Sequence, residues 1–214
     1  RAVGTDFAYL AYAGVVGQTL DQQIKTRALD DTQKKRLGQH IGLFLKQLHG
    51  LSLTSCPEED PRQEVRVLHE KYQLGLDYLK AHLSAPELEH LDDLVQHTLP
   101  KGLQDLGYER VLSHGDLGFW NMVYQETPTG PGLGIIDFGD IGYYDASRDF
   151  VGLSEPLMLE AALAVYGDTP HLRAKITRRQ KILPILELPY HLGKGNRDEA
   201  LQTLQRLRIM QYAL

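Results

Sequence analysis

Beyond its first twenty residues, this 214-residue chain carries a hydrophobic pattern that is helical almost everywhere, and this periodicity limits the folds open to it. From Thr32 onward, apolar residues recur at three- and four-residue steps as far as Gly50, which is placed to end a helix. An Asp-Pro pair at residue 60 and a Ser-x-x-Glu pattern at residue 84 are typical starts of two further helices. The first half of the chain is therefore predicted to be helical.

Residues 111–137 depart from the helical period. Two β-prone pieces, residues 122–124 and 133–136, lie on either side of the turn-forming sequence QETPTGPG, as in a β-hairpin. Residues 7–12 have the pattern of one more short strand, followed by a glycine-punctuated turn. The sequence thus predicts a mainly α fold of the α+β class, in which a helical body carries a small β-hairpin.

Helices are expected to resume near Ser147, although Pro156, Pro184 and Pro189 should break or kink them. The last helix is expected to start at Asn196. One basic run has helical spacing and no interleaved aromatic residues, which is the pattern of a solvent-exposed helix face. It consists of Arg173, Lys175, Arg178, Arg179 and Lys181.

The composition is that of a globular protein, with 42% hydrophobic residues and a net charge of −5. The mild acidity disfavours a nucleic-acid partner and favours cationic ligands. A single cysteine, Cys56, fits a reducing compartment, and no apolar run is long enough to suggest a membrane segment, so we expect a cytoplasmic protein. Because the chain begins at Arg1 rather than at a methionine, we expect a further segment to precede it.

The stretch LSHGDLGFWNMVY, residues 112–124, places polar side chains in an apolar frame. Buried carboxylates are costly unless they are paired or used, which makes Asp116 a candidate for chemistry. Asn121, five residues later, and Asp137, directly after the second β-prone piece, would meet at the end of the hairpin. Their oxygens, together with phosphate oxygens, would suit Mg²⁺.

The five-residue spacing of Asp116 and Asn121, followed by an Asp-Phe-Gly triplet at residue 137, is that of protein-kinase catalytic segments. His-Gly-Asp in place of His-Arg-Asp points away from protein kinases proper. With HGDLGFWN and IIDFGD, the chain resembles the aminoglycoside phosphotransferase and choline kinase-like superfamily, and GIIDFGDIGYYDASRDF is most similar to the aminoglycoside 2″-phosphotransferases.

This resemblance implies a role for each matched residue. Asp116 corresponds to the catalytic base, Asn121 and Asp137 to Mg²⁺ ligands, and His114 to a histidine that organises the loop. Asp149 corresponds to an aspartate that braces it. Near the start of the chain, the resemblance implies that backbone groups near Tyr12 and Ala13 meet the purine of ATP or GTP.

The implied fold is the carboxy-terminal lobe of a two-lobed kinase. Residues 1–20 would form the hinge strand and linker from a missing amino-terminal lobe, and residues 21–214 the lobe itself, with its catalytic loop at 112–124 and its metal-binding segment at 135–149. The lobe that holds the nucleotide phosphates would precede Phe7, so the isolated chain is expected to be inactive.

The implied activity is Mg²⁺-dependent transfer of a γ-phosphoryl group to a hydroxyl of a small acceptor, aminoglycoside-like or otherwise cationic. Related proteins bind the acceptor through acidic residues on carboxy-terminal helices, for which the candidates here are Glu155, Glu160, Glu187 and Asp198.

Other readings remain open. Asp and Asn commonly cap turns, and Asp145 is expected to do only that. Asp140 fits a supporting role in the site and a solvated turn carboxylate equally well. We expect Phe119 and Trp120 to pack beneath the loop rather than line an acceptor pocket. The chain as a whole could instead be a non-catalytic kinase-like binding module, whereas a phosphohydrolase would need histidine ligands at spacings that are absent.

Overall fold

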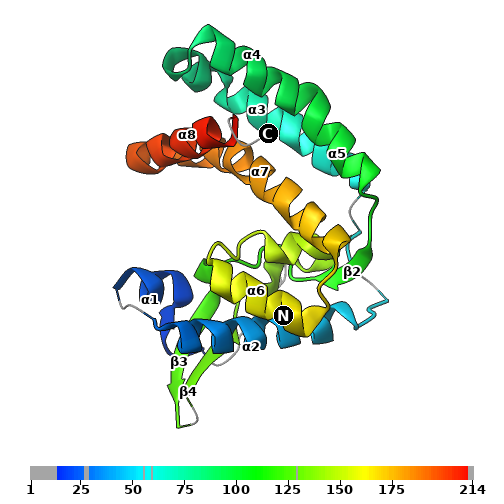
Figure 1. The fold of residues 1–214 in the computed structure, drawn as a ribbon, viewed down its shortest axis with the longest axis vertical. Helices are drawn as coiled ribbons and strands as arrows, with labels where there is room; N and C mark the ends of the chain where they lie inside the picture. The colour runs from blue at the N-terminus through cyan, green and yellow to red at the C-terminus, as the bar shows by residue number, and fades with distance from the viewer. Residues whose placement is uncertain (1–13, 27–28, 55, 59, 129, 212–214) are drawn as a thin grey trace, which may run out of the picture.

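The computed structural model describes residues 14–26, 29–54, 56–58, 60–128 and 130–211 (Figure 1). Its helices are α1 (Leu20–Thr26), α2 (Asp31–His49), α3 (Pro61–His82), α4 (Ala85–Asp93), α5 (Leu99–Asp105), α6 (Pro156–Tyr166), α7 (Pro170–Gly193) and α8 (Arg197–Gln211). Its strands are β1 (Gln18–Thr19), β2 (Arg110–Ser113), β3 (Met122–Thr127), β4 (Gly130–Ile135) and β5 (Gly142–Asp145). Within these described ranges, no helix has the length and apolarity that crossing a membrane requires.

Helix starts follow the capping signals of the sequence. Asp30 accepts a hydrogen bond from the Gln33 N–H at 2.8 Å, and Gln33 Oε1 accepts one from the Asp30 N–H at 3.1 Å. At α3, Asp60 accepts from the Arg62 N–H at 2.9 Å and a proline takes the first helical position. At α4, Glu87 accepts from the Ser84 N–H at 2.7 Å. These contacts satisfy amide groups that a helix start leaves without partners, and they confirm the predicted helices.

The strands form two small antiparallel sheets. β3 pairs with β4, so that Met122 lies opposite Ile135, and β1 pairs with the other edge of β3. The predicted hairpin is therefore confirmed, with strands longer than expected. In the second sheet β2 pairs with β5, which places Ser113 opposite Gly142. The two sheets together bring the segments that follow β2 and β4 to the same place.

Buried apolar side chains form two clusters. The first joins α1, α2, α6 and the hairpin, and the second joins α3, α4, α5 and α8. Helix α7 contributes to both, with Leu172 and Ile176 in the first cluster and Ile182, Ile185 and Leu188 in the second. In Figure 1, α7 accordingly runs from the end of the molecule that holds α6 to the end that holds α3 and α8.

The prolines of the last third behave differently from one another. Pro156 occupies the first turn of α6, where its missing N–H costs nothing. Pro184 and Pro189 lie inside α7, which is continuous across both, so of the expected break or kink the break does not occur. Pro184 is itself buried, and Ile185 and Leu188 beside it are packed into the second cluster, so apolar burial offsets the lost hydrogen bonds. Residue 147, where a helix was expected to resume, lies in a 3₁₀ helix, Ala146–Phe150, and α8 starts one residue after Asn196.

Candidate active site

The 112–124 loop leaves β2 through a glycine that no other residue could replace without strain. Gly115 has a φ of 88°, and a Cβ at this position would lie 2.2 Å from the backbone oxygen of Asp140. L-residues with a side chain rarely adopt this φ, and the approach of Asp140 leaves no room for one. The backbone path itself therefore requires the glycine between His114 and Asp116.

The buried carboxylate of Asp149 faces the backbone of this loop. It accepts hydrogen bonds from the His114 N–H at 2.8 Å and the Gly115 N–H at 3.0 Å, while His49 Nε2 lies 3.1 Å from it. The other nitrogen of His49 is 2.9 Å from the Tyr166 hydroxyl. Because Asp149 is fully buried, each of these partners offsets the cost of desolvating its charge.

His114 is fully buried, and both of its ring nitrogens are engaged. Nε2 lies 2.9 Å from the Ile136 carbonyl oxygen, which can only accept, so Nε2 carries the proton. Nδ1 then accepts from the Asp116 N–H at 3.4 Å. The ring also packs against Phe138, with 4.8 Å between ring centroids. The structure thus places His114 as a positioning residue that joins the two polar segments.

Asn121 closes the loop around Asp116. Its Nδ2 donates to the Asp116 carbonyl at 2.9 Å and to Oδ2 of the Asp116 carboxylate at 3.0 Å. The Trp120 indole N–H reaches the same oxygen at 3.4 Å. Within the described part of the chain, Oδ1 of Asp116 has no hydrogen-bond partner. One carboxylate oxygen is therefore held in place while the other is open.

Asp137 follows β4 in an unusual backbone conformation. The Ile136 N–H donates to the Asn121 carbonyl at 3.0 Å, so the hairpin register brings Asp137 next to Asn121 along the backbone. Asp137 has a φ of 62°, a left-handed conformation that costs roughly 1–3 kcal/mol for a residue other than glycine. Its carboxylate is exposed, and no described residue donates a hydrogen bond to it. Asp140, three residues on, is also exposed, which leaves both of its expected roles open.

The oxygens near this point suit a hard cation. Among the described residues there is no cluster of three or more His, Cys, Asp or Glu side chains that could hold a metal by themselves. Mg²⁺ does not need one, because it keeps several waters and takes substrate phosphate oxygens as ligands. Both nitrogen-bound protons of the Asn121 amide point at Asp116, which leaves the amide oxygen as an acceptor. Asn121 and Asp137 therefore fit a pair of oxygen ligands.

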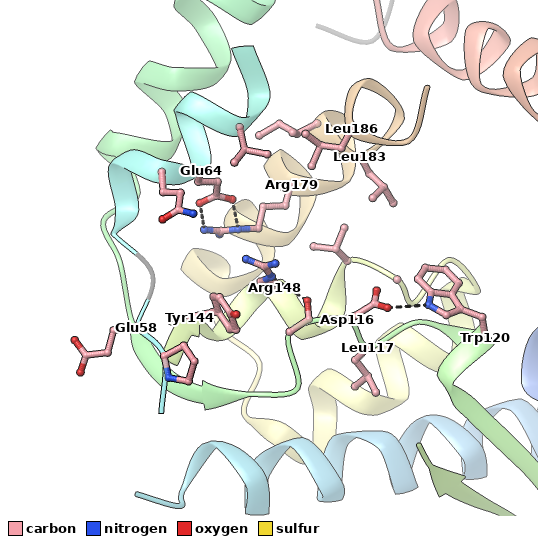
Figure 2. Close-up of a pocket in the computed structure, with 17 residues that line it drawn as sticks. Glu58, Glu64, Asp116, Leu117, Trp120, Tyr144, Arg148, Arg179, Leu183 and Leu186 are labelled. Atoms are coloured by element: carbon pink, nitrogen blue, oxygen red, sulfur yellow. Dashed lines mark hydrogen bonds and ion pairs between the residues drawn. The ribbon is translucent and has the colours of Figure 1, made fainter. Parts of the chain in front are cut away.

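A cleft of about 530 Å³ opens beside the loop (Figure 2). The following residues line it: Pro57, Glu58, Gln63, Glu64, Val67, Gly115, Asp116, Leu117, Trp120, Tyr144, Arg148, Val151, Gly152, Arg179, Ile182, Leu183 and Leu186. Asp116 thus faces the cleft, whereas Asn121 and Asp137 are outside this set. Phe119 is buried in the first cluster as expected, but Trp120 is 47% exposed and lines the cleft, so the packing role expected for Trp120 is wrong.

A buried ion cluster that the sequence did not reveal lies at one wall of the cleft. Asp145 accepts from Lys175 Nζ at 2.8 Å and from Arg179 at 3.1 Å, and Arg179 also forms two 2.8 Å bonds with Glu64. Lys175 and Arg179 are 2% and 8% exposed. The solvent-exposed face expected for the basic run is therefore wrong at these two positions. Their spacing of four residues, in line with Leu172, Ile176 and Ile182, was a signal that they share the buried face of α7.

Asp145 does cap the following 3₁₀ helix, since its carboxylate accepts from the Ser147 N–H at 3.1 Å. Burial alone would raise the pKa of this carboxyl. The charge of Arg179 and hydrogen bonds from Lys175, Ser147 and the Glu109 N–H outweigh burial and lower the pKa below its ordinary value. Asp145 is thus ionised and holds β5, α7 and, through Arg179 and Glu64, α3 together.

The four acidic residues expected to bind an acceptor are outside the cleft lining, and three of them meet cations of the chain itself. Glu155 caps α6 and lies 3.1 Å from Lys34, Glu160 pairs with Arg173 at 2.6 Å, and Glu187 pairs with Arg206 at 2.6 Å. Asp198 is exposed in the first turn of α8. Tyr12, Ala13 and the strand expected at residues 7–12 lie outside the described residues.

Known proteins share this fold. The sequence profile of the phosphotransferase enzyme family, APH, matches residues 2–179. The GDP and kanamycin complex of APH(2″)-IIIa has a TM-score of 0.70 to this chain at 22% identity, covering 94% of this chain and 70% of that one. The gentamicin complex of APH(2″)-IIa has a TM-score of 0.65 at 18% identity, covering 94% and 72%. Choline kinase LicA from Streptococcus pneumoniae has a TM-score of 0.59 at 20% identity, covering 88% and 68%. No curated protein sequence matches the chain.

Proposed function

Because this chain belongs to the phosphotransferase enzyme family, we propose that it transfers the γ-phosphoryl group of a nucleoside triphosphate to a hydroxyl of a small acceptor in the cleft. Solved structures of similar fold are complexes with GDP or ADP, and some hold kanamycin or gentamicin. These ligands support a nucleotide donor and a small acceptor. They leave ATP and GTP as equal candidates for the donor.

The observation that carries the proposal is the state of the Asp116 carboxylate. One oxygen is held by Asn121 at 3.0 Å, and the other faces the cleft without a partner among the described residues. A general base must be fixed in direction and must have a free lone pair for the proton that it accepts. In this chain, Asp116 would orient the acceptor hydroxyl and take its proton as the oxygen attacks phosphorus.

Asn121 and Asp137 are the residues that would hold Mg²⁺. When bound, the metal would supply charge neutralisation on the phosphate oxygens, which is the main requirement of phosphoryl transfer. The left-handed backbone of Asp137 is strained, and such strain is typical of a residue whose side chain must be held in one direction for function. His114 and Asp149 would keep the two polar segments in register without touching substrate.

The test is acceptor-dependent nucleotide turnover by the protein, with ATP and GTP as donors. Asp116→Asn keeps the shape of the side chain and removes the basic oxygen. We expect it to lower kcat roughly a hundredfold or more while leaving the KM for acceptor within about twofold. Asp77→Asn, an exposed position on α3 outside the cleft, is the matched control and should turn over at the parental rate.

Two outcomes would count against the proposal. Parental turnover by Asp116→Asn would remove Asp116 from the chemistry. If the unmodified protein binds nucleotide and acceptor but transfers no phosphoryl group, it is the non-catalytic binding module that the sequence left open.

A further inference from the structure

The charges that line the cleft are largely neutralised within the chain. Among the described residues that line it are three carboxylates and two guanidinium groups, whose net formal charge is −1. Glu64 is bound through both oxygens to Arg179 at 2.8 Å, and Glu58 lies 2.7 Å from Arg110. In Figure 2, the Glu58 carboxylate also points away from the space between α7 and the loop. Asp116 remains as the acidic group directed at a ligand.

The second cationic side chain of the cleft is also held by the protein. Arg148 donates to the Gly115 carbonyl at 3.0 Å, and its guanidinium group stacks on the Tyr144 ring at 4.1 Å from the ring centroid. These contacts fix its position against the loop. Glu64 and Arg179 are paired with each other, so among the described lining residues Asp116 and Arg148 supply one charge of each sign to the surface that a ligand would meet.

The wall opposite Asp116 is apolar. It consists of Ile182, Leu183 and Leu186 from α7 and Val67 from α3, and Figure 2 places Leu183 and Leu186 across the cleft from Asp116 and Trp120. Trp120 is the single tryptophan of the chain, and its ring is half-exposed at the cleft rim. Apolar and aromatic surfaces with a few convergent polar groups are typical of sites for small, partly apolar ligands.

We propose that the acceptor of this cleft is an uncharged or weakly charged hydroxylated amphiphile rather than a polycation. Its hydroxyl end lies at Asp116, and its apolar face lies against Leu183, Leu186 and Trp120. This inference rests on the proposed function for the identity of the site as the acceptor site. A volume of about 530 Å³ is that of a pocket for a ligand of a few fused rings or a short alkyl glycoside.

A polycationic acceptor lacks the partners that it would need here. Each ammonium group taken from water requires a carboxylate or several acceptors in return. Glu58 and Glu64 already have guanidinium partners, and the acidic residues of α6 and α7 that were expected to bind an acceptor lie outside the cleft. The apolar face of an amphiphile, by contrast, can pack against the apolar wall of the same cleft without any rearrangement of the protein.

A matched pair of ligands tests this directly. Octyl β-D-glucoside, used below its micelle concentration, and methyl β-D-glucoside carry the same hydroxyl groups and differ in the apolar tail. Burial of two methylene groups already gives roughly a tenfold gain in affinity. We expect the octyl glucoside to bind the full protein at least about tenfold more tightly and to shift the emission of Trp120 to shorter wavelength. Kanamycin should produce no such shift, and lowering the salt concentration should not bring its affinity up to that of the octyl glucoside.

Two variants test whether octyl glucoside binds at the apolar wall of the cleft. Leu183→Asp places a carboxylate on the apolar wall, so it should weaken octyl glucoside binding about tenfold and strengthen kanamycin binding at low salt. Leu74→Asp, at a 69% exposed position on α3 outside the cleft, is the control and should change neither. Circular dichroism verifies that each variant is folded. The ligand pair on the unmodified protein decides the question even if Leu183→Asp does not fold.

Equal affinities for the two glucosides, or tighter and salt-sensitive binding of kanamycin, would overturn the inference while leaving phosphoryl transfer intact. Octyl glucoside binding that neither shifts the Trp120 emission nor responds to Leu183→Asp would be detergent adsorption elsewhere, and it would also overturn the inference. Tight octyl glucoside binding with the expected Trp120 response, together with no phosphoryl transfer to any hydroxyl compound, would refute the proposed function and retain the apolar site.

Discussion

Replacing Lys175 with methionine would leave a buried carboxylate short of one partner. Lys175 Nζ lies 2.8 Å from Asp145 Oδ2, and the two side chains are 3% and 1% exposed. Methionine keeps the length and bulk of the aliphatic stem and removes the charge. Breaking a buried pair from one side costs about 3–5 kcal/mol when no other partner remains. Asp145 retains Arg179, Ser147 and the Glu109 N–H, so we expect a loss of about 2–3 kcal/mol in the free energy of unfolding.

The pKa of Asp145 determines how the stability lost in Lys175→Met depends on pH. The pKa of Asp145 is lowered in the folded protein, so its contribution to stability is fully present above the unfolded-state value of about 3.9 and is lost as pH falls through the folded-state value. Lys175→Met removes one of the groups that lower this pKa. The variant should therefore have lost the whole Asp145 contribution at a higher pH than the parent.

Urea unfolding followed by circular dichroism measures both effects, at about pH 7 and again at about pH 3. A loss of 2–3 kcal/mol corresponds to a Tm about 4–12 °C lower in a chain of this size. The control is the same substitution in an Asp145→Asn background, where the charge to be compensated is absent and the further cost should fall below about 1 kcal/mol. If Lys175→Met costs less than about 0.5 kcal/mol at neutral pH, the ion cluster does not stabilise the fold as argued.

Three shorter predictions concern the loop and its neighbours. Gly115→Ala should lower the free energy of unfolding by at least about 1–3 kcal/mol and abolish turnover, because a Cβ would lie 2.2 Å from the Asp140 backbone oxygen. Gly107→Ala is the control, because Gly107 also has a positive φ, 64°, but no atom close to the added Cβ. Equal melting temperatures for the two variants would contradict this prediction. Asp149→Asn replaces one carboxylate oxygen with an N–H₂ group, which cannot accept from the backbone N–H groups of His114 and Gly115. Steady-state kinetics should therefore show kcat falling at least about tenfold with little change in KM. A change in KM alone would exclude a positioning role. Asp137→Ala should weaken nucleotide binding in the presence of Mg²⁺ but not in its absence, and calorimetry showing the same loss under both conditions would remove Asp137 from the metal site.

The fold was largely predictable because its signals are local. Helix α2 follows from its apolar period and its cap, and the hairpin from a turn sequence between two β-prone pieces. The family, too, was recognisable from residues 112–149, and the match of residues 2–179 confirms it. The backbone contact between Ile136 and Asn121 follows from the same hairpin register.

The features that sequence reasoning missed depend on packing between distant segments. Lys175 and Arg179 look like surface residues until α7 is placed against Asp145, 30 and 34 residues away. Trp120 was expected to pack beneath the loop, yet the loop turns it toward the cleft. The acidic residues on α6 and α7 were chosen by helix alone, and which face of a helix borders a cleft is decided by the whole fold.

The sharing of α7 between two apolar clusters has a consequence for how the molecule unfolds. Neither cluster can come apart alone without stripping α7 from one side, so we expect residues 1–214 to melt in a single cooperative transition rather than as two independent units. Amide hydrogens in the middle of α7, near Ile176 and Ile182, should exchange with solvent only through that global event. Because α7 forms one wall of the cleft, we expect this wall to stay rigid until the whole protein unfolds.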